Sequence, residues 1–135
     1  MFKRKILSKL EAWKRDERHK PLILRGARQV GKTTVVNEFG SQFDNYLYFN
    51  LEMNESVRLF EMDIPLNDLV NMLFASLGKS QREGSTLIFI DEIQNSPKTI
   101  ALLRYFYEQR PDLYVIAAGS LLENLVDVNV SFPVG

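Results

Sequence analysis

The chain has 135 residues, of which 45% are hydrophobic and 25% charged, and its formal net charge is zero. These fractions are typical of one globular domain with a proper core and exclude a largely disordered chain. The absence of cysteine excludes a disulfide scaffold, a cysteine zinc site and a cysteine nucleophile, and it fits the reducing cytoplasm. No apolar run is long enough to span a bilayer, so we expect no membrane partner.

The hydrophobic pattern predicts helices and strands in alternation. Phe2, Ile6, Leu10 and Trp13 recur at helical spacing and predict an amphipathic helix over 3–17 with its lysines and arginines outward. The other predicted strands and helices, in chain order, are strand 21–25, helix 32–39, strand 46–51, helix 54–60, helix 66–77, strand 86–90, helix 97–109 and strand 113–118.

Small and polar residues mark the ends of these helices. Gly40 and Gly78 end two of them, Asn54 is a candidate cap for the short helix, and Ser96 before a proline begins the last. His19 is the only histidine, and we interpret it as an inert residue of a polar loop. Strands that are apolar throughout and separated by helices predict an α/β domain with a parallel sheet covered on both faces.

The charge is unevenly distributed along the chain. Residues 1–32 carry eleven lysines and arginines against three acidic residues, a net charge of +8, and residues 33–135 carry −8. A chain-wide basic surface for nucleic acid is therefore absent, so net charge does not support nucleic acid as a partner. A solvated helix face and a phosphate-binding loop account for the basic segment more simply.

A glycine-bearing turn between the first predicted strand and the second helix matches the pattern G-x-x-x-x-G-K-[ST] in full. Its glycines let successive backbone N–H groups surround a phosphate, and the following helix adds its positive end. We expect Lys32 to reach the β and γ phosphates and the Thr33 hydroxyl to bind Mg²⁺. The expected nucleotide-binding residues are Gly26, Ala27, Arg28, Gln29, Val30, Gly31, Lys32, Thr33 and Thr34. The alternative is a tight turn with a surface lysine, which would leave its cations beside a positive helix end without a counter-anion.

Two acidic residues follow the apolar strand 86–90. Because ligands of a parallel sheet bind beyond the carboxyl ends of its strands, Asp91 is expected to face the phosphate loop and hold Mg²⁺ opposite Thr33. Glu92 is a candidate to polarise the attacking water, and the alternative is that both acids cap the loop or face solvent. Ser120 follows the last predicted strand and is either a contact of the γ-phosphate or part of a plain Gly-Ser turn.

Together these residues resemble the P-loop ATPases that carry an additional catalytic glutamate, a group that includes the AAA+ proteins. The narrower likeness is to prokaryotic AAA-type ATPases with a nuclease-like C-terminal domain, and it rests on "KPLILRGARQVGKTT", "LIFIDEIQNSP", "VIAAGSLL" and "SFPVG". It covers nearly the whole chain. The resemblance implies a single P-loop ATPase domain over 1–135, with a helix over 1–20 and a nucleotide-binding core over 21–135.

The resemblance also implies a three-layer sandwich with sheet order 5-1-4-3-2. Only four strands are found, in the order 1-4-3-2, so we expect the fifth to follow Gly135 and the chain to be a truncated fragment. The first strand would then be an exposed edge. The later arginines that contact the γ-phosphate in this family have no counterpart, and the spacing of Arg28 and Arg104 does not support that role. We expect the isolated fragment to hydrolyse slowly or not at all.

The expected function is binding of ATP and Mg²⁺ with hydrolysis, in which Glu92, Lys32 and Ser120 take part, to drive or switch a partner. The expected partners are the protein's own missing C-terminal domain and a second copy of the chain, and nucleic acid is left open as a partner although net charge does not support it. The alternative is a nucleotide-dependent interaction switch that does not hydrolyse ATP. A kinase is weaker because no acceptor-binding lid is found, and a GTPase because no Asn-Lys-x-Asp segment is found.

Overall fold

The computed structural model describes residues 2–25 and 31–119, and at residues 2, 3, 25 and 32 it describes the backbone alone. The elements in chain order are α1 (Phe2–Arg15), β1 (Leu22–Arg25), α2 (Lys32–Gly40), β2 (Asn45–Asn50), α3 (Asn54–Phe60), α4 (Leu66–Ser76), β3 (Thr86–Asp91), the 3₁₀ turn η1 (Ile93–Asn95), α5 (Pro97–Gln109) and β4 (Tyr114–Gly119). The predictions for residues 26–30 and Ser120 fall outside the described residues, as does that of a fifth strand.

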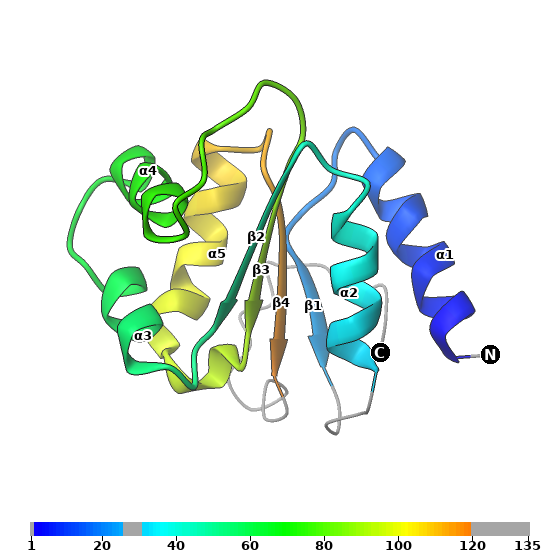
Figure 1. Cartoon of the computed structure of the whole chain (residues 1–135), viewed down its shortest axis with the longest axis horizontal. Helices are drawn as coiled ribbons and strands as arrows, with labels where there is room; N and C mark the ends of the chain where they lie inside the picture. The colour runs from blue at the N-terminus through cyan, green and yellow to red at the C-terminus, as the bar shows by residue number, and fades with distance from the viewer. Residues whose placement is uncertain (1, 26–30, 120–135) are drawn as a thin grey trace.

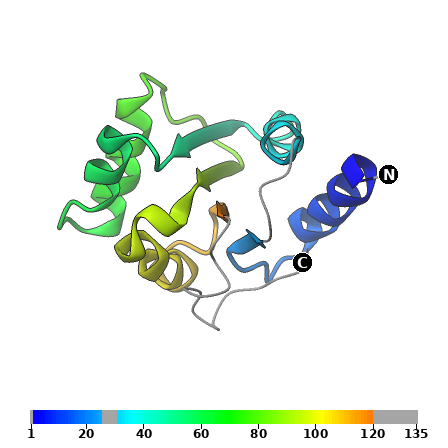
Figure 2. The ribbon, with the colours of Figure 1, turned by 90° about the horizontal axis from the view of Figure 1, so that it is seen from below.

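The four strands form one parallel sheet in the order β1-β4-β3-β2, which confirms the predicted order. Helices α1 and α2 cover one face, and α3, α4 and α5 cover the other, as Figures 1 and 2 show. The predicted α/β sandwich of three layers is therefore confirmed. All strand arrows in Figure 1 end at the same edge of the sheet, which is also the edge where α2 begins.

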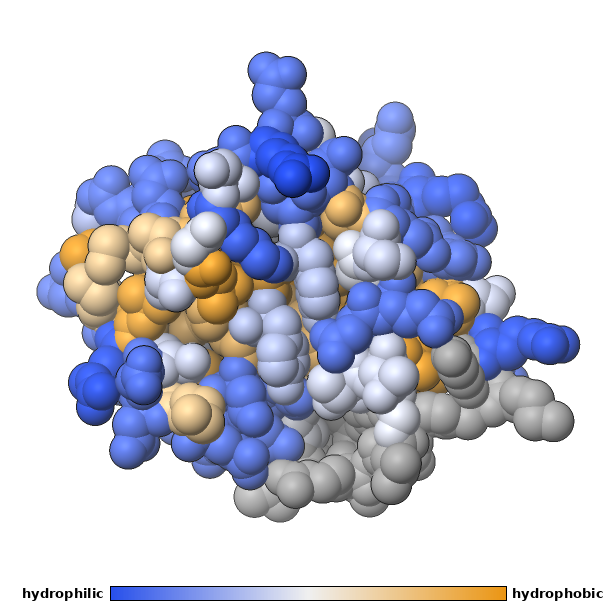
Figure 3. Space-filling view, in the orientation of Figure 1, coloured by the Kyte–Doolittle hydropathy of each residue, from blue (hydrophilic) through white to orange (hydrophobic). Residues whose placement is uncertain are grey.

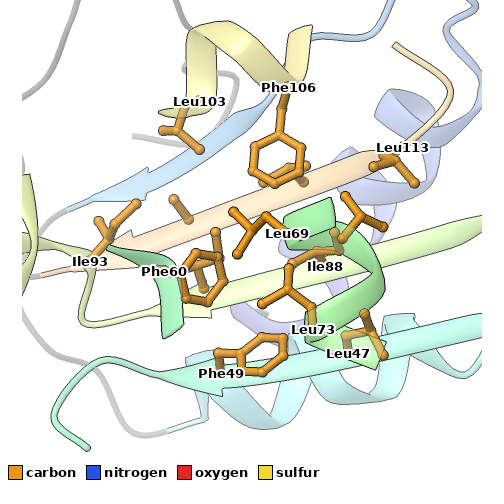
Figure 4. Packing of buried hydrophobic residues seen from close by; sticks show 14 of the residues in the cluster. Leu47, Phe49, Phe60, Leu69, Leu73, Ile88, Ile93, Leu103, Phe106 and Leu113 are labelled. Carbon is orange, nitrogen blue, oxygen red and sulfur yellow. The ribbon is translucent and has the colours of Figure 1, made fainter. Parts of the chain in front are cut away.

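Each face of the sheet has its own hydrophobic core, which explains why the strands are apolar throughout. In β3, Leu87 and Phe89 belong to the core under α1 and α2, and Ile88 and Ile90 belong to the core under the other helices. Figure 4 shows part of the second core, where side chains from the sheet, α3, α4 and α5 meet. Because side chains alternate along a strand, two buried faces require apolar residues at every position.

Apolar side chains also reach the surface on the α3 and α4 side of the molecule, where Figure 3 shows orange colour. The large exposed ones near these helices are Met53, Met62, Met72 and Leu77. At the opposite end of the sheet, β1 has only β4 as a neighbour among the described strands, yet Leu22, Ile23 and Leu24 are at most 1% exposed. No helix in the described residues is long and apolar enough to cross a membrane.

All the predicted boundaries lie within two residues of the observed ones, and the largest difference, at the end of α1, has a local cause. Helix α1 ends at Arg15 because the backbone then turns, with the Asp16 carboxylate accepting from the Arg18 N–H at 2.9 Å. Ser96 caps α5 as predicted by accepting from the Thr99 N–H, whereas Asn54 is the first residue of α3 and does not cap it.

The interpretation of His19 as a residue of a polar loop is wrong about its surroundings. The imidazole is only 9% exposed, and its ring stacks on Tyr114 with centroids 3.9 Å apart. Its Nε2 lies 3.0 Å from the carbonyl oxygen of Leu113. Burial against β4 therefore makes His19 a structural link between the α1–β1 connection and the sheet.

Helix α2 approaches the sheet closely at Gly40. A Cβ at this position would lie 2.7 Å from the ring of Tyr46, whose hydroxyl is held by a hydrogen bond to Asn37 on the same helix. The Tyr46 ring is held by its backbone in β2 and by the hydrogen bond of its hydroxyl to Asn37, so it has little room to move away from a Cβ at position 40. Glycine at this position thus lets α2 pack directly on β2.

We expect Gly40→Ala to destabilise the protein by about 1 kcal/mol, because overpacking costs about 1–3 kcal/mol and outweighs the ~1 kcal/mol by which helix propensity favours alanine. Urea unfolding followed by circular dichroism measures the change. Asn71→Ala, at an exposed position of α4, is the control and should be neutral or stabilising. A Gly40→Ala variant more stable than the unmodified chain would contradict the close approach.

Candidate functional site

The candidate site lies at the edge where the parallel strands end and α2 begins. Gly31 precedes α2 with φ 97° and ψ −12°, in the left-handed region that favours glycine, and no side chain caps the helix. The first turn of α2 holds no acidic residue. The N–H groups of this turn therefore have no side-chain acceptor from a cap, which suits an anionic ligand.

A hydroxyl from α2 meets a carboxylate from β3 at this edge. Thr33 Oγ1 donates to Asp91 Oδ2 at 3.1 Å, across 58 positions of sequence. Asp91 is the last residue of β3 and pairs in register with Asn50, the last residue of β2. The parallel ladder and the start of α2 thus bring together the two residues predicted to hold a metal ion.

Tyr48 also contacts this carboxylate, and the sequence analysis did not single it out. Its hydroxyl donates to Asp91 Oδ2 at 3.0 Å, the same oxygen that Thr33 contacts. Burial raises the pKa of Tyr48 well above its ordinary value, and the negative charge of Asp91 and the hydrogen bond to it raise this pKa further. The phenol is consequently protonated at neutral pH and donates the hydrogen bond to Asp91. The available signal was a tyrosine near the end of this strand, but β2 carries two tyrosines, Tyr46 and Tyr48, and the sequence does not show which of them contacts Asp91.

The backbone changes direction sharply at Glu92, immediately after the strand. Glu92 has φ 53° and ψ 44°, and it is the only non-glycine residue with positive φ in the part of the chain that the structure describes. Its N–H donates to Asp91 Oδ1 at 2.9 Å, and its Oε1 accepts from Gln94 Nε2 at 2.8 Å. A left-handed non-glycine residue costs about 1–3 kcal/mol, and such strain is concentrated at functional sites.

Gln94, which contacts Glu92, is a second residue of the site that the sequence analysis missed. Its Oε1 is the one buried side-chain oxygen or nitrogen without a hydrogen-bond partner within the described ranges. The signal for it was weak, because η1, the 3₁₀ turn that carries Gln94, was not predicted.

The other predicted site residues are placed only in part. Lys32 begins α2, and only its backbone is described. Thr34 is exposed on α2, and Arg104 is exposed on α5. Residues 26–30 and Ser120 lie outside the described residues. Gly119, the residue before Ser120, pairs in register with Arg25 at the end of β1, so β4 ends at the same edge.

The oxygen ligands in this site fit Mg²⁺. Thr33 supplies a hydroxyl and Asp91 a carboxylate within hydrogen-bond distance of each other, and both are hard oxygen ligands. Within residues 2–25 and 31–119, no group of three histidine, cysteine, aspartate or glutamate side chains gathers as a metal site. A cation held by few protein ligands keeps water and nucleotide phosphates as its other ligands, as Mg²⁺ usually does.

Comparisons with known proteins agree on one class of domain. The family model described as an AAA domain matches residues 18–135. The Orc1 protein of Aeropyrum pernix, solved in complex with DNA, has a similar structure with a TM-score of 0.57 and 17% identity, over 90% of this chain and 38% of that one. PCH-2 of C. elegans matches with a TM-score of 0.52 and 12% identity, over 97% of this chain and 42% of that one. No match was found among curated proteins.

These identities show a shared fold and nothing finer. The chain spans about two fifths of the length of both structural neighbours, 38% and 42%. The activities and partners of a whole protein therefore do not follow from this likeness.

We expect Glu92→Gly to be more stable than Glu92→Ala by about 1 kcal/mol, because both remove the carboxylate but only alanine keeps a Cβ in the left-handed region. Thermal and urea unfolding of the two variants measure the difference. An alanine variant as stable as the glycine variant would show that Glu92 is not held at positive φ.

Proposed function

The chain belongs to the AAA domain family, and we propose that it binds ATP with Mg²⁺ and hydrolyses it to drive or switch a partner. Membership in the family, together with the fold shared with Orc1 and PCH-2, supports a nucleotide-binding ATPase. The observation that carries the finer proposal is the contact between the Thr33 hydroxyl and the Asp91 carboxylate. It pairs the residue after the phosphate-loop lysine with the acid at the end of β3, which is how P-loop nucleoside triphosphatases hold Mg²⁺ for phosphoryl transfer.

In this proposal each element of the site has one task. Residues 26–32 surround the phosphates with backbone N–H groups, and Lys32 contacts the β and γ phosphates. Thr33 and Asp91 hold Mg²⁺, which neutralises phosphate charge when it is bound. Ser120 contacts the γ-phosphate or the attacking water from the end of β4.

Glu92 is the proposed base for the attacking water. Its carboxylate orients the water and accepts its proton as the water oxygen bonds to the γ-phosphorus and the bond to the β-phosphate oxygen breaks. The backbone leaves the strand direction at Glu92, with φ 53° and ψ 44°. In this proposal Asp91 holds the metal and Glu92 faces the water.

A nucleotide-dependent switch without hydrolysis is the second candidate. The observation that favours it is the hydrogen bond of 2.8 Å from Gln94 Nε2 to Glu92 Oε1, because a base held by a neighbouring amide is less free to engage water. The two candidates differ in turnover and agree in nucleotide binding.

The partner and location are also proposals. We infer a partner domain joined to the same protein, as in the AAA-type ATPases that the sequence resembles, or a second copy of the chain. The Orc1 protein of Aeropyrum pernix was solved with DNA, but the net charge of zero does not support nucleic acid as a partner of this chain. A cysteine-free chain fits the cytoplasm.

Lys32→Ala should weaken binding of MgATP about tenfold or more, because one charge-assisted hydrogen bond to a phosphate contributes about 1.5–3 kcal/mol and ~1.4 kcal/mol is a factor of ten. Glu92→Gln keeps the shape of the side chain and should bind nearly as tightly as the unmodified chain. Titration of a fluorescent ATP analogue into the three proteins measures this, and equal affinity across the set would overturn the site assignment.

Glu92→Gln should lower hydrolysis about 10²- to 10⁴-fold wherever the unmodified protein has measurable turnover, since this is the usual contribution of a general base. The assay measures phosphate release at saturating MgATP, with the chain alone and with any longer protein that contains it. An unchanged rate in the variant would favour the switch that does not hydrolyse ATP.

A further inference from the structure

Within the described residues, the Asp91 carboxylate is held by three hydrogen bonds, one from α2, one from β2 and one from the residue that follows β3. Oδ2 accepts from Thr33 Oγ1 at 3.1 Å and from Tyr48 Oη at 3.0 Å, and Oδ1 accepts from the Glu92 N–H at 2.9 Å. A carboxylate oxygen has two lone pairs. Among the described residues, hydroxyls therefore occupy both positions on Oδ2, and Oδ1 accepts a single hydrogen bond.

We propose that Tyr48 is a positioning residue that fixes the Asp91 carboxylate for Mg²⁺, so that Oδ1 is the oxygen left to face the metal or its water. This inference rests on the proposed function, and it adds a residue from β2 to a site otherwise built from α2 and β3. Tyr48 acts through Asp91 and has no contact of its own with nucleotide in this proposal.

The sheet fixes the position of the Tyr48 hydroxyl. Tyr48 pairs in register with Phe89, and its ring packs on that of Phe89 with centroids 5.3 Å apart. Phe89 is fully buried in the core under α2. The Tyr48 hydroxyl reaches Asp91, which lies two residues after Phe89 at the end of β3. Since the ring is already held by packing, its hydroxyl restrains Asp91 at little additional cost in side-chain entropy.

Packing alone does not require a hydroxyl at this position. A phenylalanine has the same ring and avoids burial of a polar group, which costs free energy unless the group is hydrogen-bonded. The Tyr48 hydroxyl offsets this cost by its bond to Asp91. Without the Tyr48 hydroxyl, Thr33 would be the only one of these two donors left on Oδ2, and the Asp91 carboxylate could rotate away from the metal.

Tyr46 provides a matched control on the same strand. It lies two residues before Tyr48, also beside α2, but its hydroxyl contacts Asn37. Tyr46→Phe and Tyr48→Phe remove the same atom from the same strand and keep both rings. Only the second removes a contact of Asp91.

The test measures ATP affinity with Mg²⁺ and with EDTA, for the full 135-residue chain. The readout is the ratio of the two dissociation constants. We expect Tyr48→Phe to leave the affinity in EDTA unchanged and to reduce the gain from Mg²⁺ about three- to tenfold, because it removes one hydrogen bond that positions the Asp91 carboxylate. Tyr46→Phe should keep the full gain.

A double-mutant cycle shows whether Tyr48 acts through Asp91. In the Asp91→Asn background, Tyr48→Phe should change the Mg²⁺ gain by less than about twofold, since the group it positions is gone. An equal reduction in that background overturns the proposal, as does an equal reduction in Tyr46→Phe or none in Tyr48→Phe.

ATP binding by the unmodified chain, measured with and without Mg²⁺, distinguishes a failure of this inference from a failure of the proposed function. If this chain binds ATP and gains affinity from Mg²⁺, the variants decide the role of Tyr48. If it fails to bind ATP, or binds it without any response to Mg²⁺, the proposed function itself fails and the inference fails with it.

Discussion

The parallel alignment of the strands is the constraint on which the candidate site depends. Parallel strands place all their carboxyl ends at one edge, so Asp91 at the end of β3 lies beside the end of β2 and near the start of α2. An antiparallel neighbour would bring a strand beginning to this edge instead. The contact between Thr33 and Asp91 thus follows from two features: the parallel direction of the strands, and the turn at Gly31, after which α2 begins at this edge.

Packing on both faces keeps this edge in place. The two cores hold β3 from either side, and β3 has paired strands on both of its edges. The close approach of α2 to Tyr46 at Gly40 fixes the far end of the helix that begins with the phosphate-loop lysine. A small shift of α2 would move the Thr33 hydroxyl relative to the Asp91 carboxylate. The stability of the fold and the geometry of the site therefore have the same structural origin.

The elements and the residues that meet at the edge were predictable from hydrophobic period, glycine positions and one long motif, whereas the sheet order followed only from the resemblance to the P-loop ATPases. Tyr48 was not, because an aromatic residue in an apolar strand is usually a core residue and register decides where its hydroxyl reaches. The interpretation of His19 was wrong because its burial depends on Leu113, 94 positions away, and on Tyr114 of β4. The left-handed turn at Glu92 and its contact with Gln94, two residues later, follow from no hydrophobic period or motif in the sequence. The roles predicted for residues 26–30 and Ser120 stay predictions.

The response of ATP binding to Mg²⁺ tests the central claim most directly, namely that Thr33 and Asp91 form a metal site for a bound nucleotide. Calorimetric titration of ATP into the chain and into Asp91→Asn, each with Mg²⁺ and with EDTA, compares the two proteins under both conditions. We expect Mg²⁺ to strengthen binding about tenfold or more in the unmodified chain and much less in the variant, since loss of one charge-assisted contact costs about 1.5–3 kcal/mol. The same strengthening in both proteins would contradict the claim.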